Sequence, residues 1–304
     1  MPNISVTKIA SLAGHIGSVY TLLQDTGEPH LFYSASGDGK IIRWNLKDLP
    51  NGLLVAQVNS NIFSMLLLPQ QNKMLLGQMQ GGIHVLDLKE NKEVKHLAYH
   101  QQGVFDLLYV PERRLVLAAG GDGVLSVWND DFSLKQSFQI SPKSIRQIAF
   151  HPSKKILALG CSDTTAYVIQ AEDFGIAHRL PEHESSVFSV CFSADGRYLL
   201  TGSRDAHLRI WDAEDDFRLF KKIPAHLFTI NCIACSPDGK LFATASRDKS
   251  IKIWDAQNFD LLKVIDKEKM HGHINSVNKL LWTNYDNLLV SCSDDRSVMV
   301  WRVE

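Results

Sequence analysis

Side chains of Ser or Thr, His and Asp recur together four times along this 304-residue chain, and they are the residue types of a hydrolase triad. A triad needs one exposed nucleophile beside a base, whereas every set here includes a Trp and recurs along the chain. The chain has no Gly-x-Ser-x-Gly elbow and no phosphate-binding loop, and its glycine pairs Gly81-Gly82 and Gly120-Gly121 are typical of hairpin turns. We therefore interpret the sets as structural and predict no catalytic residue.

The cysteines are a second group that could do chemistry. They are Cys161, Cys191, Cys232, Cys235 and Cys292. Their odd number and mostly apolar surroundings favour reduced core thiols over a disulfide framework. Cys232 and Cys235 form a CxxC motif, but strand alternation directs the two side chains to opposite faces, which argues against a shared metal. We predict neither a metal site nor a cofactor.

The composition excludes several classes of partner. The chain is 45% hydrophobic and 21% charged, its formal net charge is −1, and neither half carries a charge excess. A nucleic-acid or membrane-surface binder would show such an excess. The N-terminal residues lack the apolar core of a signal peptide, and no stretch approaches the ~18–20 apolar residues of a membrane span. We expect a cytoplasmic protein.

The elements that position these side chains follow a repeat. One motif recurs along the chain. It consists of an Asp, two residues, an apolar-x-apolar triplet and a Trp, so that the Trp stands six positions after the Asp. Five copies keep both ends, and they span 38–44, 122–128, 205–211, 248–254 and 295–301. Two worn copies, 80–86 and 163–169, keep the hydrophobic frame but lack one or both of the end residues. The last positions are spaced 42, 42, 41, 42, 43 and 47 residues apart, and this period indicates a repeat architecture.

A single repeat predicts four short strands. Residues 187–192, 198–203 and 207–211 have the β-branched, apolar and aromatic composition of strands, a tight turn falls at 194–196, and a fourth strand follows residue 212. Four such strands form a small antiparallel sheet with two hydrophobic faces, which one sheet cannot bury alone. Seven sheets packed around an axis bury every face.

The chain resembles the WD-repeat (WD40-type) β-propeller family over essentially residues 1–304. Trp211-Asp212 and Trp254-Asp255 match the dipeptide that names the family, and Gly14-His15 and Gly272-His273 match its Gly-His pair. The resemblance implies an all-β fold with a single domain, a seven-bladed propeller of four-stranded antiparallel blades whose repeats end at positions 44, 86, 128, 169, 211, 254 and 301.

The family implies a buried hydrogen-bond set in each well-kept blade, made of a His, a strand Ser or Thr, the turn Asp and the Trp. Carried onto this sequence, the sets are His15, Ser34, Asp38 and Trp44; His183, Thr201, Asp205 and Trp211; His226, Thr244, Asp248 and Trp254; and His273, Ser291, Asp295 and Trp301. These groups satisfy one another when buried. Blade three keeps His100, Asp122 and Trp128 but has Ala118 at the hydroxyl position, blade four keeps only Asp163, and blade two keeps none. We expect blades two and four to open most easily.

The two ends of the chain are predicted to meet. Residues 4–12 precede the first Gly-His pair as residues 261–270 precede the last one, so they resemble the fourth strand of the blade that ends at position 301. The long final spacing places an insertion at 266–270, which we expect to be a charged, solvated loop.

The resemblance also places a candidate binding surface at the mouth of the central channel. Three positions per blade point there in the family: three and five residues after the His, and just before the turn Asp. The candidate partner-binding residues are Tyr20, Phe63, Met79, Phe105, Arg146, Phe188, Arg204, Asn231, Arg247, Asn278 and Asp294. Blades one to three are apolar and aromatic at the mouth, whereas blades four to six carry its arginines.

This surface predicts the type of ligand. Aromatic and Arg side chains dominate interface hot spots, and Arg binds carboxylate or phosphate groups bidentately. We hypothesise a peptide or protein with a hydrophobic anchor beside an acidic or phosphorylated residue. The alternatives are that the aromatic rings only pack between blades, and that the arginines form salt bridges with Asp294 or Glu184.

We interpret the chain as a non-catalytic protein-protein interaction scaffold. Two other functions remain open. One is a substrate-recognition or regulatory subunit of a larger enzyme complex, and the other is a small-molecule-binding or hydrolytic propeller.

Overall fold

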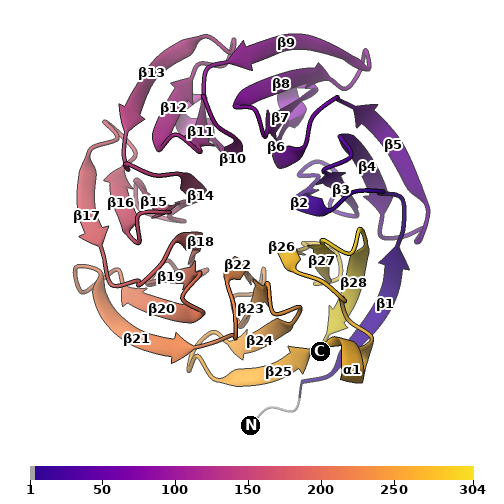
Figure 1. The fold of residues 1–304 in the computed structure, drawn as a ribbon, viewed down its shortest axis with the longest axis vertical. Coiled ribbons are helices and arrows are strands. Elements are labelled where there is room, and N and C mark those ends of the chain that lie inside the picture. Colours follow the sequence, from indigo (N-terminus) through magenta and orange to yellow (C-terminus); the bar gives the residue numbers. More distant parts are fainter. Residues whose placement is uncertain (1–3) are drawn as a thin grey trace.

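Seven four-stranded antiparallel sheets are arranged around a common axis in the computed structural model, which describes residues 4–304 (Figure 1). Each strand has five to seven residues, mostly apolar or β-branched, and polar turns separate the strands. The prediction of an all-β, seven-bladed propeller is confirmed. We number the blades in chain order, so that blade one begins at β2 and blade seven at β26.

The strands of each blade run from the axis to the rim. The inner strands are β2 (Val19–Gln24), β6 (Ile62–Leu68), β10 (Val104–Val110), β14 (Ile145–Phe150), β18 (Val187–Phe192), β22 (Ile230–Cys235) and β26 (Val277–Trp282). The second strands are β3 (Leu31–Ser36), β7 (Lys73–Gln78), β11 (Leu115–Gly120), β15 (Ile156–Cys161), β19 (Tyr198–Ser203), β23 (Leu241–Ser246) and β27 (Leu289–Ser293).

The remaining strands complete each blade. The third strands are β4 (Lys40–Asn45), β8 (Gly82–Asp87), β12 (Val124–Trp128), β16 (Ala166–Gln170), β20 (His207–Asp212), β24 (Ile251–Asp255) and β28 (Val298–Val303). The outer strands are β5 (Gly52–Gln57), β9 (Lys92–Ala98), β13 (Leu134–Gln139), β17 (Ile176–Leu180), β21 (Arg218–Pro224), β25 (Leu261–Ile265) and β1 (Val6–Leu12).

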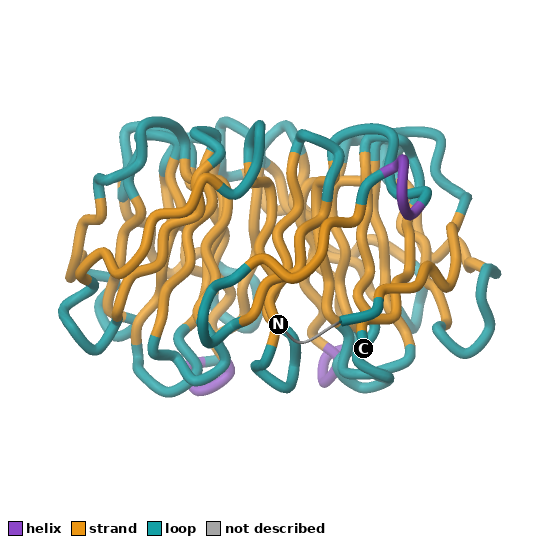
Figure 2. The backbone as a smooth tube through the Cα atoms, turned by 90° about the horizontal axis from the view of Figure 1, so that it is seen from below, coloured by secondary structure: helices purple, strands orange, loops and turns teal. Residues whose placement is uncertain are grey.

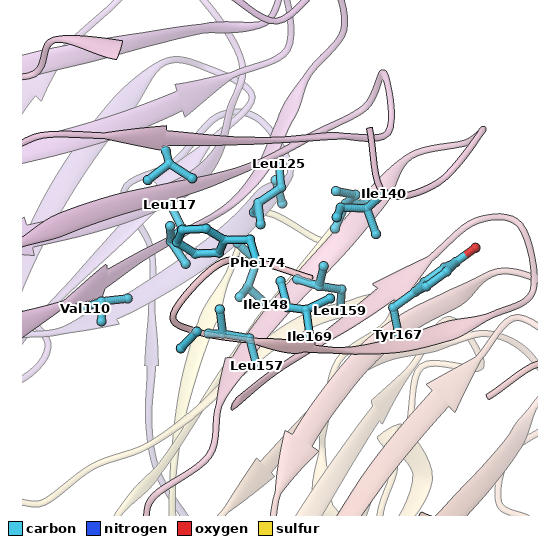
Figure 3. Close-up of a cluster of buried hydrophobic side chains, with 14 of the residues drawn as sticks. Val110, Leu117, Leu125, Ile140, Ile148, Leu157, Leu159, Tyr167, Ile169 and Phe174 are labelled. Atoms are coloured by element: carbon cyan, nitrogen blue, oxygen red, sulfur yellow. The ribbon is translucent and has the colours of Figure 1, made fainter. Parts of the chain in front are cut away.

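The hydrophobic core is divided among the contacts between neighbouring blades. Within residues 4–304, seven clusters of buried apolar side chains lie one at each blade interface. Figure 3 shows the cluster in which Leu117 and Leu125 of blade three face Leu157, Leu159 and Ile169 of blade four. Both faces of every sheet are therefore covered, as the apolar composition of the strands requires.

The ring closes by pairing the two ends of the chain. β1 runs antiparallel to β28, from Val6 opposite Val303 to Leu12 opposite Val298. The backbone of Ser5 also exchanges hydrogen bonds with Glu304, at 2.6 and 3.0 Å, and β1 lies beside β28 in Figure 1. The expected closing strand is present, although it begins at Val6, two residues later than predicted.

The two faces of the ring carry different loops. The loops with the repeat His and the turn Asp lie on one face, called here the mouth face, together with α1 (Lys267–Met270) (Figure 2). The opposite face, called here the lower face, carries η1 (Pro69–Gln71) and η2 (Pro111–Arg113). In the part of the chain that is described, no helix is long and apolar enough to cross a membrane.

The expectation of a loop at 266–270 is wrong. Residues Lys267–Met270 form α1 because Asp266 caps its N-terminus and accepts a hydrogen bond from the backbone N–H of Lys269 at 2.8 Å. The insertion therefore has local order of its own on the mouth face.

The turns that carry the repeat Asp share one backbone conformation. The residue after the Asp position has a positive φ in all seven blades, and these residues are Gly39, Gly81, Gly123, Thr164, Ala206, Lys249 and Arg296. Glycine adopts this conformation without strain, whereas the β-branched Thr164 at φ 77° does not. The turn geometry is thus imposed by the blade even where the local sequence disfavours it.

Candidate partner-binding mouth

A β-bulge at the mouth end of every inner strand positions the central ring of candidate residues. In blade one, Val19 pairs with Ser36 and Thr21 with Ala35, so Tyr20 has no partner in the register. The bulged residues of the seven blades are Tyr20, Phe63, Phe105, Arg146, Phe188, Asn231 and Asn278. A bulge re-aims a side chain out of the pleat. All seven therefore line one cavity of about 170 Å³ on the ring axis.

The aromatic members of this ring touch one another and remain partly exposed. The ring centroids of Tyr20 and Phe63 are 5.1 Å apart, and those of Phe63 and Phe105 are 5.4 Å apart. The guanidinium carbon of Arg146 lies 4.3 Å from the centroid of Phe105 and 4.8 Å from that of Phe188. Packing among the rings and exposure at the mouth thus coexist, and blades one to five present a continuous apolar wall that contains one cation.

The mouth arginines are not neutralised by carboxylates. Within residues 4–304, the arginines that form ion pairs are Arg114, Arg197, Arg209, Arg218 and Arg302. Arg146 instead donates from Nε to Ser162 Oγ at 2.8 Å, and burial lowers the pKa of its guanidinium. Arg204 and Arg247 are exposed on the turns of blades five and six.

The salt bridges considered as an alternative do not form. Glu184 lies 3.5 Å from Lys222, and Asp294 accepts a hydrogen bond from Asn278 at 2.8 Å. The three mouth arginines therefore keep their hydrogen-bonding capacity for a ligand, apart from the Nε of Arg146.

Two polar candidates, Asn231 and Asn278, hold neighbouring blades together. Asn231 Nδ2 donates to Ser276 Oγ at 3.0 Å and to the backbone oxygen of Val277 at 2.9 Å, which joins blade six to blade seven. Asn278 Nδ2 donates to Asp294 and to the backbone oxygen of Val19 at 2.9 Å, which joins blade seven to blade one. These amides are already engaged, so they shape the mouth more than they bind a ligand. The remaining candidate, Met79, is half exposed at the mouth of blade two.

The structure contains all four hydrogen-bond sets that the family resemblance implied. The Trp Nε1–H donates to the strand hydroxyl at 2.8 to 3.0 Å, and that oxygen lies 2.7 to 2.9 Å from the His Nε2. The His Nδ1 lies 3.4 Å from Asp38 in blade one and 2.9 to 3.0 Å from the Asp in the other three. Because the carboxylate only accepts, Nδ1 carries the proton and Nε2 accepts from the hydroxyl.

Burial sets the charge state of these networks. It lowers the pKa of His15, His183 and His226, although the neighbouring carboxylate raises it, so these imidazoles stay neutral. Burial acts to raise the pKa of Asp205, but hydrogen bonds from His183 and the backbone N–H of Glu184 outweigh it and lower the pKa. With every hydroxyl buried and bonded, the sets offer no exposed nucleophile.

Blades two, three and four lack a complete set, and each uses a polar side chain from a position that the repeat leaves undefined. This is the x of the apolar-x-apolar triplet, and its occupants are Ile42, His84, Ser126, Tyr167, Arg209, Lys252 and Met299. In blade three, Ser126 Oγ takes the place of the hydroxyl missing at Ala118, at 2.8 Å from both His100 Nε2 and Trp128 Nε1. In blade four, Tyr167 donates to Asp163 at 2.7 Å.

Blade two has a network of its own. His84 lies 3.1 Å from Gln78 Oε1 and 3.0 Å from Glu93, and Gln78 Nε2 lies 2.9 Å from His96. The opening of blades two and four stays a prediction, but both have replacement hydrogen bonds that the sequence reading missed. The polar residues His84, Ser126 and Tyr167 at the x position were the sequence signal for these hydrogen bonds.

An exposed apolar arc beside the mouth was also missed. Within residues 4–304, the four most exposed large hydrophobic side chains are Ile16, Leu227, Phe228 and Ile274, with Leu227 at 83%. They directly follow the repeat His in blades six, seven and one, where blades three and five carry Gln101 and Glu184. We call these four residues the apolar arc. The spacing from the His would have revealed it.

The ring interior below the mouth contains few groups for chemistry. Asp106 accepts a hydrogen bond from the backbone N–H of Ile148 at 2.9 Å, and burial raises the pKa of its carboxyl. Burial also opposes the charge of Lys279, but attraction to Asp106 outweighs it and raises the pKa of the amine. Across residues 4–304, no three His, Cys, Asp or Glu side chains gather as metal ligands would.

Comparison with known proteins agrees with this geometry. The sequence model of the family described as WD domain, G-beta repeat matches residues 91–129, 175–212, 217–255 and 266–302, about half of the chain. Each segment contains one Asp-to-Trp frame, and these frames belong to blades three, five, six and seven.

Curated relatives share part of the chain. The chain is 26% identical over 167 residues to the guanine nucleotide-binding protein subunit beta-like protein 1 of Mus musculus, which covers 54% of this chain and 48% of the relative. It is 25% identical over 159 residues to WD repeat-containing protein 55 of Rattus norvegicus, with 51% and 41% covered, and 24% identical over 137 residues to Jouberin of Rattus norvegicus, with 43% and 13% covered.

The matched segment spans less than half of the length of each of these relatives. WD-repeat propellers generally act as non-catalytic scaffolds for protein interactions. The repeated Asp-to-Trp frame, the seven blades and the four matched repeats lead to one conclusion: this chain belongs to the WD-repeat family of β-propellers.

Proposed function

We propose that this protein is a non-catalytic scaffold that binds a segment of a partner protein across the mouth face. The segment places a hydrophobic or aromatic residue against Tyr20, Phe63 and Phe105, and an acidic or phosphorylated residue on Arg146. Arg204 and Arg247 belong to the two blades that follow that of Arg146, and they attract further negative charge on the partner segment. We place this activity in the cytoplasm, because the composition and the reduced cysteines fit that compartment.

One observation supports the proposal above the others. Arg146 is held between the rings of Phe105 and Phe188 without a carboxylate, in a cavity that aromatic side chains line from blade one to blade three. A partly buried cation without a counter-charge is costly, and an anionic ligand group removes that cost. The rings exclude water around the charge, which strengthens a bidentate Arg–carboxylate or Arg–phosphate contact.

The apolar arc supports a protein partner over a small molecule. Its four exposed hydrophobic side chains lie at equivalent positions of three consecutive blades, and such exposed apolar surface is typical of interaction sites. Because the arc lies on blades six, seven and one, a partner that covers both it and the mouth contacts most of the ring. Such a footprint also fits a permanent recognition or regulatory subunit of an enzyme complex, which would co-purify at fixed stoichiometry.

The test is affinity capture from a lysate of the cells that make the protein. Wild type is compared with a mouth variant that combines Phe105→Ala, Arg146→Ala and Arg204→Ala. A rim variant with Leu53→Ala, Leu134→Ala and Arg218→Ala serves as the matched control, because these side chains are exposed on the outer strands. All three proteins must show cooperative thermal unfolding before they are compared.

We expect wild type and the rim variant to retain the same partner and the mouth variant to lose it. Retention by the mouth variant together with loss by the rim variant would move the binding surface to the outer strands. If the wild type retains no protein but binds a small molecule in the axial cavity, the scaffold proposal is wrong.

A further inference from the structure

Two cysteines from adjacent blades meet at the lower face. Cys191 lies near the end of β18 in blade five, and Cys235 ends β22 in blade six. The two strands lie side by side in Figure 1. The two Sγ atoms are 3.4 Å apart, within hydrogen-bond distance. The backbone oxygen of Phe192 lies 3.3 Å from Cys191 Sγ and 3.6 Å from Cys235 Sγ, which fixes both thiols at the strand ends.

This pair differs from the other cysteines of the chain. Cys161, Cys232 and Cys292 are fully buried, and burial raises the pKa of each thiol. Cys191 and Cys235 are both partly exposed. The hydrogen bond from Cys235 lowers the pKa of Cys191, and the same bond raises the pKa of Cys235. Cys191 is therefore the thiol with more thiolate character, and reactivity toward oxidants follows thiolate character and exposure.

We propose that Cys191 and Cys235 form an oxidation site, at which a peroxide converts the two thiols into a disulfide between blades five and six. The Cys191 thiolate attacks one peroxide oxygen, the O–O bond breaks, and hydroxide leaves to give a sulfenic acid on Cys191. The Cys235 sulfur then attacks the Cys191 sulfur and the sulfenic oxygen leaves as water. For hydrogen peroxide the balance is two thiols and one peroxide to one disulfide and two waters.

The geometry needs little movement. The two sulfurs already face each other, so rotation of the side chains brings them to bonding distance while each strand stays paired in its own sheet. The bond closes a loop of chain that includes β19, β20 and β21, so it constrains the unfolded state. It also ties together the two blades that carry Arg204 and Arg247 on the opposite face.

The test follows the thiols of the reduced, folded protein during treatment with hydrogen peroxide. Samples are quenched in acid, unfolded and alkylated with N-ethylmaleimide, and intact mass and peptide maps are recorded. We expect alkylated thiols to fall from five to three, with one linked peptide pair that contains Cys191 and Cys235. The oxidised protein should melt at a higher temperature, and dithiothreitol should reverse the shift.

Variants separate this pair from general oxidation. Cys191→Ser should keep four alkylated thiols. Cys235→Ser should fall from four to three, with an oxidised Cys191 and no linked pair, whereas Cys292→Ser should fall from four to two with the same linked pair. If Cys191→Ser does not fold, Cys235→Ser still tests the pair, because it removes the resolving thiol and should abolish the linked peptide. Five alkylated thiols after peroxide treatment, or a sulfinic acid on Cys191 without the linked pair, would overturn the proposal.

Discussion

Replacing Ser126 with Ala should destabilise blade three strongly. The hydroxyl is fully buried and is the hydrogen-bond partner of both Trp128 Nε1 and His100 Nε2, each at 2.8 Å. Without it, two buried ring nitrogens lose their partners. An orphaned buried polar group costs about 1–3 kcal/mol, so the loss of two partners should lower the free energy of unfolding by about 2–6 kcal/mol. The measurement is the urea midpoint together with its slope.

The neighbouring strand offers a rescue. Ala118 lies directly opposite Ser126 in the register, at the position from which Ser34 supplies the hydroxyl in blade one. Adding Ala118→Ser to Ser126→Ala should therefore recover most of the lost stability. Ser137→Ala on β13 is the matched control, because Ser137 is exposed, and it should change stability by less than about 0.5 kcal/mol.

Two results would refute this reasoning. One is a Ser126→Ala variant that loses no more stability than Ser137→Ala. The other is a double variant that folds but is no more stable than Ser126→Ala alone. Either result would mean that the hydroxyl does not satisfy the two rings.

Three further predictions concern acid, turn strain and ring closure. Burial lowers the pKa of four repeat histidines below the ordinary histidine value of about 6.5, and these are His15, His100, His183 and His226. As the pH falls below about 6.5, these histidines bind protons in the unfolded chain before they do so in the folded chain. The free energy of unfolding is therefore unaffected by them above about pH 6.5 and decreases below it, by up to about 1.4 kcal/mol per His per pH unit. Urea midpoints measured from pH 7.5 to 5.5 should fall steeply, and a flat profile contradicts the buried neutral assignment. Thr164→Gly should raise the free energy of unfolding by about 1 kcal/mol, because Thr164 holds a left-handed conformation; an unchanged or lower melting temperature speaks against strain there. Deleting residues 1–12 removes β1 and exposes the edge of β28, so hydrogen exchange should accelerate in blade seven and thermal unfolding should begin earlier. Exchange like that of wild type in β28 would show that closure contributes little.

The fold was accessible from the sequence because its signal is redundant. Seven hydrophobic frames at nearly constant spacing each predict the same four strands, and the excess of apolar faces requires a closed ring. The four hydrogen-bond sets followed from the family resemblance because their residues keep both type and spacing. Even worn blades kept enough of the apolar pattern to be counted.

The site was harder because it depends on register and on neighbours. No periodicity shows that Tyr20 or Asn231 occupies a bulge, since a bulge depends on how two strands pair. The sequence predicts Asn231 and Asn278 as partner-binding residues, but their amides donate to backbone oxygens of the next blade, and such contacts depend on blade spacing. Ser126 was overlooked because its hydroxyl comes from the third strand, at a position where the repeat tolerates any residue.

The most direct test of the mouth as a binding surface is the dissociation constant of the minimal partner segment, measured for wild type and for Arg146→Ala. A central hot spot contributes about 2 kcal/mol or more to the binding free energy. We therefore expect the dissociation constant of an Arg146→Ala variant that still folds to be at least about tenfold larger than that of the wild type. A dissociation constant unchanged by Arg146→Ala, but weakened by the rim substitutions Leu53→Ala, Leu134→Ala and Arg218→Ala, would contradict it.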